Sequence, residues 1–368
     1  MQPEVRVVIA SDGKRGHENQ SRVLARMLGD TEPLVMHLRN PEGGWGETLL
    51  RAAFALRGKW RMPKRSAGER VRELMRPESP AAFRDFSAEI GRNRDAYRIF
   101  TVSTGTPPAT GNLLLSCLLD AEALCVMTPS MLPKRLFKLM IVPQHDARYK
   151  VPENVIVHPL ALSYHDHARA NQVAREVKDQ ANFNCETKYL VLAIGNISDF
   201  PNPSEFVLTA VREIAREYGY KLLLTTSRRT HAVHLEAIKE VLISSEGLVA
   251  HFVDAAKDSM NPLPGYFEFA ERVIITSDSY SMVGEAIQAG HQPIVCMYDR
   301  ERTKLRKALA ALKQQSLIKM LDTTNFDGNV GLLNGYRADW AGTPGRIFEP
   351  NRFYNELRAE VRSRLGLD

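Results

Sequence analysis

Residues 273–297, VIITSDSYSMVGEAIQAGHQPIVCM, decide the fold class. An apolar, β-branched run of strand length opens the stretch at 273–276, and a second such run closes it at 292–297. Between them, residues 279–289 have the length and composition of a helix that starts at a hydroxyl residue and stops before Gly290. A strand, a helix and a strand in this order predict a βαβ unit with parallel strands.

The same alternation runs through most of the chain. The other strands that we expect lie at 5–10, 98–103, 123–127, 138–142, 189–194, 221–225 and 248–252. A polar, alanine-rich helix at 163–183 separates two series of strands, and an amphipathic helix at 350–365 ends the chain. The pattern predicts an α/β protein with two doubly wound domains facing a cleft. We place the N-terminal domain at 1–165 together with 346–368, and the C-terminal domain at 166–345.

Composition agrees with two globular domains. The chain has 368 residues, of which 44% are hydrophobic and 25% are charged. The first residues carry no signal-peptide pattern, and no apolar run has the length of a membrane span. The four cysteines form no CxxC pair, as expected for a reducing compartment. We therefore expect a cytoplasmic protein, with peripheral attachment to the inner face of the plasma membrane.

That attachment is suggested by one basic segment. The segment from Arg51 to Arg76 contains nine Lys and Arg residues and only two acidic residues, Glu69 and Glu73. Its charge is therefore +7, in a chain whose net charge is +6. Trp45, Phe54, Leu56 and Trp60 add apolar side chains in and beside it. The segment suits an anionic membrane surface, and a solvated basic helix is the alternative. No RNA- or DNA-binding module accompanies the patch, so we expect no nucleic-acid partner.

Two loops follow strands in the first half, where open α/β sheets bind ligands. SDGKRGHENQ (11–20) combines Gly13 and Gly16 with Lys14 and a candidate catalytic pair, His17 and Asp12. The glycines allow a ligand to approach the backbone, and histidine is the side chain that most often serves as a general base. STGTPP (103–108) adds Thr104 and Gly105. The alternatives are a structural loop histidine and a tight turn that starts a helix.

Two further loops follow strands in the second half. TTSRRT (225–230) places Ser227 before Arg228 and Arg229, whose forked guanidinium groups suit a diphosphate. In SDSYSMVGEA (277–286), Asp278 or Ser279 would cap a helix. Ser281 and Glu285 are four residues apart on one helix face, where a carboxylate can accept hydrogen bonds from ribose hydroxyls. The alternative is that both loops are only capped helix starts.

Metal ligands are not indicated. The chain has no Asp-x-Asp motif for a metal-bridged diphosphate, and no P-loop or HExxH motif. His165, Asp166 and His167 lie together on the connector, and we interpret them as a solvated turn rather than a metal site. The sequence therefore predicts no metal and no bound cofactor.

The loops SDGKRGHENQ and TTSRRT, the stretch 261–296 (NPLPGYFEFAERVIITSDSYSMVGEAIQAGHQPIVC) and IVPQHD (141–146) together resemble the family named after the plant mitochondrial fission protein ELM1. Bacterial members of that family are classed with GT-B glycosyltransferases. The resemblance implies two Rossmann-like domains, a C-terminal helix that returns to the N-domain, and a nucleotide-sugar donor held by the TTSRRT and SDSYSMVGEA loops. Gly195 and Asn196 join the donor-binding residues, although the family has a double glycine before the asparagine. STG at 103–105 also departs from a more basic family segment.

The combined prediction is a metal-independent glycosyltransferase. His17 or Asp12 would take the proton of an acceptor hydroxyl, with Gly13, Lys14, Gly16, Thr104 and Gly105 on the acceptor side. The acceptor would be an envelope glycan or a lipid-linked glycan such as lipopolysaccharide core. Two alternatives stay open: a nucleotide-sugar epimerase that needs no acceptor, and a non-catalytic scaffold that binds membrane or protein.

Overall fold

A computed structural model gives the structure of residues 3–39, 51–52, 54, 62–76, 80–147, 150–180, 183–184, 186–196, 203–297, 303–322, 334–335, 337 and 345–368. The chain divides into two compact units. Unit 1 comprises Met1–Leu162 and Asn355–Asp368, and unit 2 comprises Ser163–Tyr354. Among the described residues, no helix combines the length and the apolar character needed to cross a membrane.

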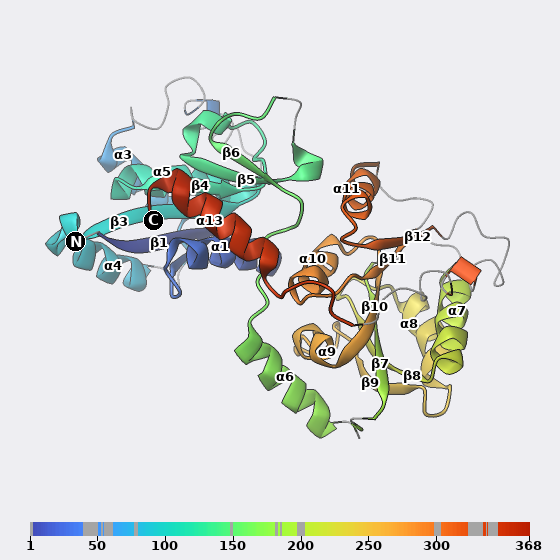
Figure 1. Cartoon of the computed structure of the whole chain (residues 1–368). Helices are drawn as coiled ribbons and strands as arrows, with labels where there is room; N and C mark the ends of the chain where they lie inside the picture. Colours follow the sequence, from blue (N-terminus) through green and yellow to red (C-terminus); the bar gives the residue numbers. More distant parts are fainter. Residues whose placement is uncertain are drawn as a thin grey trace. The chain divides into compact units, whose positions relative to one another are not determined.

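Unit 1 is built on a six-stranded parallel sheet in the order β2-β1-β3-β4-β5-β6 (Figure 1). Its strands are β1 (Glu4–Ser11), β2 (Leu34–His37), β3 (Tyr97–Thr104), β4 (Glu122–Val126), β5 (Leu139–Pro143) and β6 (Val155–His158). Its helices are α1 (Arg15–Leu28), α3 (Lys64–Leu74), α4 (Pro80–Arg92), α5 (Thr106–Leu119) and most of α13 (Arg352–Leu365). The central strands β3 and β5 are buried along nearly their whole length, as expected for a parallel sheet with helices on both faces.

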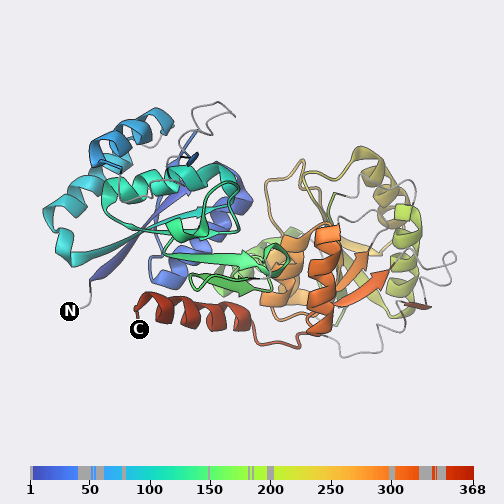
Figure 2. The same cartoon turned by 90° about the horizontal axis from the view of Figure 1, so that it is seen from above.

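The C-terminal helix α13 belongs to this unit from Asn355 onward, as the family resemblance implied (Figures 1 and 2). The Arg362 guanidinium donates to the Leu28 carbonyl oxygen at the end of α1, at 3.2 Å. Arg364 donates to the Glu153 carbonyl oxygen just before β6, at 2.7 Å. Val361 and Leu365 are buried, so an apolar stripe of α13 also contributes to the unit 1 core.

Unit 2 has a six-stranded parallel sheet in the order β12-β11-β10-β7-β8-β9, which is the Rossmann order. Its strands are β7 (Lys188–Ile194), β8 (Tyr220–Thr226), β9 (Val249–Val253), β10 (Ala270–Thr276), β11 (Ile294–Met297) and β12 (Lys319–Asp322). Its helices are α6 (His167–Gln180), α7 (Pro203–Glu217), α8 (Ala232–Ile238), α9 (Leu263–Phe269), α10 (Tyr280–Gln288) and α11 (Thr303–Gln314). In Figure 1, α7 and α8 lie on one face of the sheet, and α9 and α10 lie on the other.

Each sheet has one point where the strand order reverses. In unit 1 the chain passes from β1 to β2 on one side, and β3 then pairs with β1 on the other side. In unit 2 the strands β8 and β9 extend from one side of β7, and β10 pairs with its other side. The helices that follow these strands leave toward opposite faces, which opens a crevice at the carboxyl ends of the two central strands.

The predicted fold class, two Rossmann-like doubly wound α/β domains, is confirmed, but some boundaries differ. Residues 346–354, which we grouped with the N-terminal domain, lie in unit 2. There the Ile347 and Phe348 amides donate to the Gly290 carbonyl oxygen, and the Asn351 amide donates to the Gln288 carbonyl oxygen. The connecting helix, expected at 163–183, covers His167–Gln180.

Candidate functional site

Three of the loops predicted in unit 2 meet at the carboxyl ends of β7, β8 and β10, around Gly195. The Gly195 amide donates to the Thr276 hydroxyl at 2.7 Å, and Thr276 donates to Asp278 Oδ1 at 2.8 Å. The Asn196 amide donates to Asp278 Oδ2 at 2.5 Å. On the other side, the Thr230 hydroxyl donates to the Gly195 carbonyl oxygen at 2.7 Å. These bonds fix the loops on both sides of the β7/β10 crevice.

Position 195 must be a glycine for steric reasons. A Cβ at this position would lie 2.3–2.6 Å from the carboxyl group of Asp278. Such contacts are far inside the van der Waals distance, so any larger residue would displace Asp278. Of the two residues predicted to cap α10, Ser279 occupies the N-cap position, although its side chain forms no capping hydrogen bond. The Asp278 carboxylate instead bridges two loops.

The electrostatics of Asp278 reflect this position. Burial raises the pKa of its carboxyl group above the ordinary value, while the hydrogen bonds from Thr276 and Asn196 and the charge of Arg229 oppose that shift. The Asn196 side-chain oxygen is buried and has no hydrogen-bond partner among the described residues. A buried acceptor without a partner costs free energy, so this atom is a candidate for contact with a bound ligand.

The loop after β8 presents its two arginines to solvent. The Arg229 amide donates to the Ser227 hydroxyl at 3.1 Å, and the Ser227 amide donates to the Thr230 hydroxyl at 3.0 Å, which shapes a tight turn. Arg228 is exposed, and its guanidinium makes no hydrogen bond or ion pair within the described part of the chain. The Arg228 guanidinium is therefore free to reorient toward an anionic ligand, and the exposed Arg229, whose charge acts on Asp278, lies next to it in the sequence.

Helix α10 carries the last predicted donor-side group. Ser279 is buried at the helix start, and Ser281 is exposed. Glu285, one turn after Ser281, is partly buried, and its carboxylate forms no hydrogen bond or ion pair with any described residue. Burial raises the pKa of its carboxyl group to about 7. A partly desolvated carboxylate without a partner is unfavourable for folding and is a typical mark of a ligand-binding residue.

In unit 1 the corresponding crevice holds Asp12, His17 and Gly105. His17 lies in the first turn of α1, and its Nδ1 is 3.0 Å from Asp12 Oδ2. The Asp12 side chain is fully buried, whereas that of His17 is 24% exposed. The His17 ring lies against Gly105 at the end of β3, because a Cβ there would be 3.3 Å from His17 Cε1. This geometry orients the ring and leaves Nε2 as the nitrogen that does not face Asp12.

The other acceptor-side candidates divide into structural and exposed residues. Thr104 is buried, and its hydroxyl lies 2.9 Å from that of Ser21, so the prediction that it faces a ligand is wrong. Gly13 adopts φ +82°, and the Arg76 guanidinium packs against it and donates to the Asp12 carbonyl oxygen at 3.3 Å. Sequence reasoning missed Arg76 because it lies 64 residues from Asp12.

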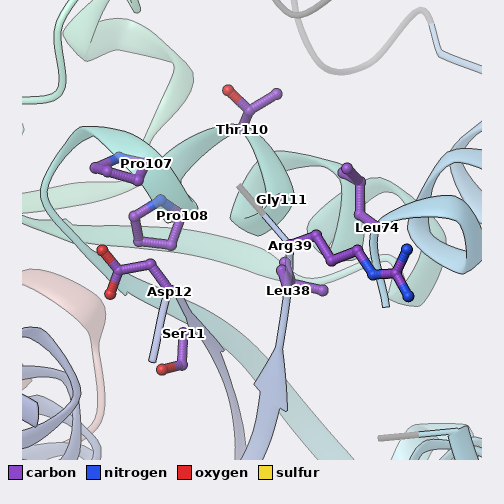
Figure 3. A pocket seen from close by; sticks show the side chains of 9 residues that line it. All are labelled: Ser11, Asp12, Leu38, Arg39, Leu74, Pro107, Pro108, Thr110 and Gly111. Carbon is purple, nitrogen blue, oxygen red and sulfur yellow. The ribbon is translucent and has the colours of Figure 1, made fainter. Parts of the chain in front are cut away.

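Lys14 and Gly16 are exposed at the start of α1. The Lys14 ammonium group lies 3.8 Å from Asp12 Oδ2, and a Cβ on Gly16 would meet open space. Next to these residues is a small pocket (Figure 3). It is lined by Ser11, Asp12, Leu38, Arg39, Leu74, Pro107, Pro108, Thr110 and Gly111. In Figure 3 the two prolines lie beside Asp12, so an apolar surface borders the buried carboxylate.

Two further predictions concern the basic segment at 51–76 and the turn at 165–167, which lie outside these crevices. In the basic segment, Arg57, Lys59, Arg61 and the tryptophans lie outside the described residues. On α3, Arg65 and Arg70 form ion pairs with Glu69 and Glu73. Membrane docking therefore stays a prediction. The interpretation of residues 165–167 as a solvated turn is wrong for His165, which is buried and lies 2.8 Å from Glu268 through Nε2.

Two Rossmann-like units, each with polar loops at its strand-order reversal, define a two-domain α/β protein of the doubly wound class. The chain belongs to the ELM1 family, because the family model described as "Mitochondrial fission ELM1" matches residues 15–344. No curated protein matches the sequence.

Several solved structures share the fold over nearly their whole length. UDP-GlcNAc 2-epimerase from Methanocaldococcus jannaschii has a TM-score of 0.54 at 12% identity, covering 97% of this chain and 99% of the other. The S. aureus MnaA–UDP structure has a TM-score of 0.51 at 12% identity, with coverage of 99% and 98%. UDP-GlcNAc 2-epimerase from Neisseria meningitidis, bound to UDP-GlcNAc, has a TM-score of 0.50 at 12% identity, with coverage of 99% and 100%. At this identity the likeness establishes the fold alone.

Proposed function

We propose that this protein is a metal-independent glycosyltransferase that moves a sugar from a nucleotide-sugar to an envelope glycan or a lipid-linked acceptor. The observation that carries the proposal is the unit 2 crevice. It combines an unpaired, partly buried carboxylate on α10, an unsatisfied Asn196 oxygen and two exposed arginines. The S. aureus MnaA structure with UDP, which has the same fold, supports a uridine nucleotide as one class to test.

Each group has a role in the proposed site. Arg228 and Arg229 would bind the diphosphate, and Glu285 would accept hydrogen bonds from the ribose hydroxyls. The α10 N-terminus near Ser279 and Ser281 adds amide donors and a positive dipole. As the bond between the anomeric carbon and the diphosphate breaks, the leaving group takes the electron pair. The arginines and the helix N-terminus would stabilise this charge without a metal.

On unit 1, His17 would act as the general base. Its Nε2 would take the proton of the acceptor hydroxyl while that oxygen forms the new bond to the anomeric carbon. Asp12, whose carboxylate is fully buried, would hold the ring and stabilise the resulting imidazolium. Because solvent reaches His17 and not the Asp12 carboxylate, we assign the base to His17 and the orienting role to Asp12.

A thermal-shift panel of nucleotides and nucleotide-sugars tests the donor site. At about 100 times the dissociation constant, a ligand adds about 2.7 kcal/mol to the stability of the native state. For a unit of this size the melting temperature should rise by roughly 5–10 °C. We expect the shift to persist in EDTA and to be lost in Glu285→Ala and Arg228→Ala. Arg175→Ala, an exposed arginine on α6, is the matched control. No shift with any nucleotide would favour the scaffold alternative.

The second candidate function is a nucleotide-sugar epimerase, favoured by the epimerases among the structures with the same fold. An epimerase changes the sugar of the donor when no acceptor is present. Incubating the protein with the donor alone, and following the anomeric protons by NMR, separates the two reactions. If a new sugar epimer forms in the absence of an acceptor, the protein is an epimerase and the transferase proposal is wrong.

The raised pKa of Glu285 leads us to expect that the free energy of unfolding depends on pH. Its folded-state pKa of about 7 lies above the ordinary value of 4.5. The folded protein therefore binds the proton more tightly, and this stabilisation is present below pH about 4.5 and lost as pH rises through about 7. At pH 8 we expect the free energy of unfolding of Glu285→Gln to exceed that of the wild type by on the order of 1–3 kcal/mol, and this difference should vanish near pH 4. An equal difference at both pH values would contradict the raised pKa.

A further inference from the structure

Three side chains with metal-binding atoms gather where the chain enters unit 2. His165 precedes α6, His167 is the first residue of α6, and Glu268 lies on α9. One ligand atom of each lies within 4.8 Å of the others, and this is the one such group found in the described part of the chain. His165 Nε2 is 2.8 Å from Glu268 Oε1, and the two imidazole rings are edge to face with centroids 4.9 Å apart.

Two of the three ligand atoms are held in place. Asn351 clamps the backbone of His165, because its side-chain oxygen accepts from the His165 amide at 2.7 Å and its side-chain nitrogen donates to the His165 carbonyl at 2.8 Å. Asn351 is buried and has φ +61°, a conformation that costs energy and is fixed by these bonds. Arg346 donates to Glu268 Oε2, at 2.7 Å, which leaves Oε1 directed at His165.

The third ligand can move. His167 is exposed, and its ring nitrogens form no hydrogen bond or ion pair with the described residues. With metal–ligand bonds of about 2.0–2.2 Å, neighbouring ligand atoms around a tetrahedral ion lie roughly 3.3 Å apart. The 2.8 Å pair must therefore open by about 0.5 Å, and His167 must rotate inward. Both changes are small for side chains, and rotation of an exposed histidine meets little resistance.

We propose that His165, His167 and Glu268 bind one divalent transition-metal ion. Two imidazoles and one carboxylate suit Zn²⁺, Co²⁺ or Ni²⁺, whereas Mg²⁺ and Ca²⁺ prefer oxygen ligands alone. Arg346 donates to Glu268 Oε2, the carboxylate oxygen that does not face His165. Carboxylates that bind metals are commonly held by such a hydrogen bond to a neighbouring side chain. A water molecule would complete the coordination, as in three-ligand zinc sites.

The charges nearby decide the strength of the site. Arg346 and the positive N-terminus of α6 both disfavour a cation, whereas Glu268 favours it and the Asp166 carboxylate, which accepts from the Arg169 amide, offsets the helix N-terminus. The affinity should therefore fall below that of a four-ligand structural zinc site. A bound metal ion would link residues 165–167, where the chain enters unit 2, to Glu268 on α9. Asn351, near the point where the chain leaves unit 2, is already hydrogen-bonded to His165. This site is separate from the donor crevice and does not depend on the proposed function.

Titration of the full-length, tag-free, EDTA-treated protein with ZnCl₂ and with CoCl₂ tests the site. We expect one ion per chain by calorimetry and a visible Co²⁺ absorption band that Zn²⁺ abolishes. His167→Ala should weaken binding at least tenfold without unfolding the protein, because the side chain is exposed. Asn171→Ala, an exposed residue one turn further along α6, should bind like the wild type. The proposal is overturned if no stoichiometric binding occurs, or if His167→Ala binds as tightly as the wild type.

Discussion

Replacing His17 by alanine should lower the kcat of sugar transfer by about 10²–10⁴-fold, the usual contribution of a general base. The variant should still bind the nucleotide-sugar, because His17 lies in unit 1 and the proposed donor-binding residues lie in unit 2. The side chain is 24% exposed and packs on Gly105, so its removal leaves no large buried cavity. The measurement is steady-state transfer with donor and acceptor in excess, combined with the thermal shift that the donor produces.

Two companion variants make the His17 result interpretable. Asn19→Ala changes an exposed residue on the same helix and should keep full activity. Asp12→Asn should also lower kcat, since an amide can hold the imidazole in the wrong tautomer. Asp12 Oδ1 accepts a hydrogen bond from the Lys14 amide as well, so the melting temperature of this variant must be checked first. Full activity of His17→Ala would show that another group takes the proton.

The sequence predicted the central strands because parallel strands buried on both faces form continuous apolar runs. It missed β2, β6 and β12, and the reason is their position. Each has only four residues and lies at an edge of its sheet, where one side is unpaired. The exposed Val157 in β6 illustrates this. A short edge strand carries too little periodic signal to be distinguished from a loop.

The loops of the candidate site were also predictable, because ligand sites follow strand ends in open α/β sheets. The hydrogen-bond partner of each side chain in these loops could not be predicted from the sequence. Thr104 and Asp278 were both assigned to the site from their place after a strand. The structure pairs Thr104 with Ser21 in the core and uses Asp278 to bridge two loops. Such pairings depend on residues that are distant in the sequence, about 80 positions away in both cases.

The buried clamp between His165 and Asn351 shows the same limit more strongly, since 186 residues separate them. From the sequence alone, neighbouring histidines before a polar helix indicate a solvated turn. The structure buries His165 because Asn351 satisfies both backbone groups and Glu268 contacts the ring nitrogen. Only the tertiary fold supplies these partners, and without them burial of the imidazole would be unfavourable.

Replacing Gly195 by alanine should weaken nucleotide binding by about 10²-fold or more. The added Cβ would lie 2.3 Å from Asp278 Oδ2, so the Asp278 carboxylate must leave its place. The Asn196 amide and the Thr276 hydroxyl would then lose a charged acceptor, and each such hydrogen bond is worth about 1.5–3 kcal/mol. Because Gly195 also joins the β8 and β10 loops, the arginines and the α10 N-terminus would shift together.

The cause can be isolated with matched variants. Gly91→Ala makes the same change on α4, where a Cβ meets nothing within 4 Å, and should bind nucleotide like the wild type. In an Asp278→Ala background the carboxylate that would clash is absent, so adding Gly195→Ala should weaken binding little further. The measurement is the nucleotide dissociation constant of each single variant and of the double variant. If the losses of the two single variants add up in the double variant, the effect of Gly195→Ala does not act through Asp278. If Gly195→Ala binds nucleotide with wild-type affinity, Gly195 and its contacts are not part of the donor site.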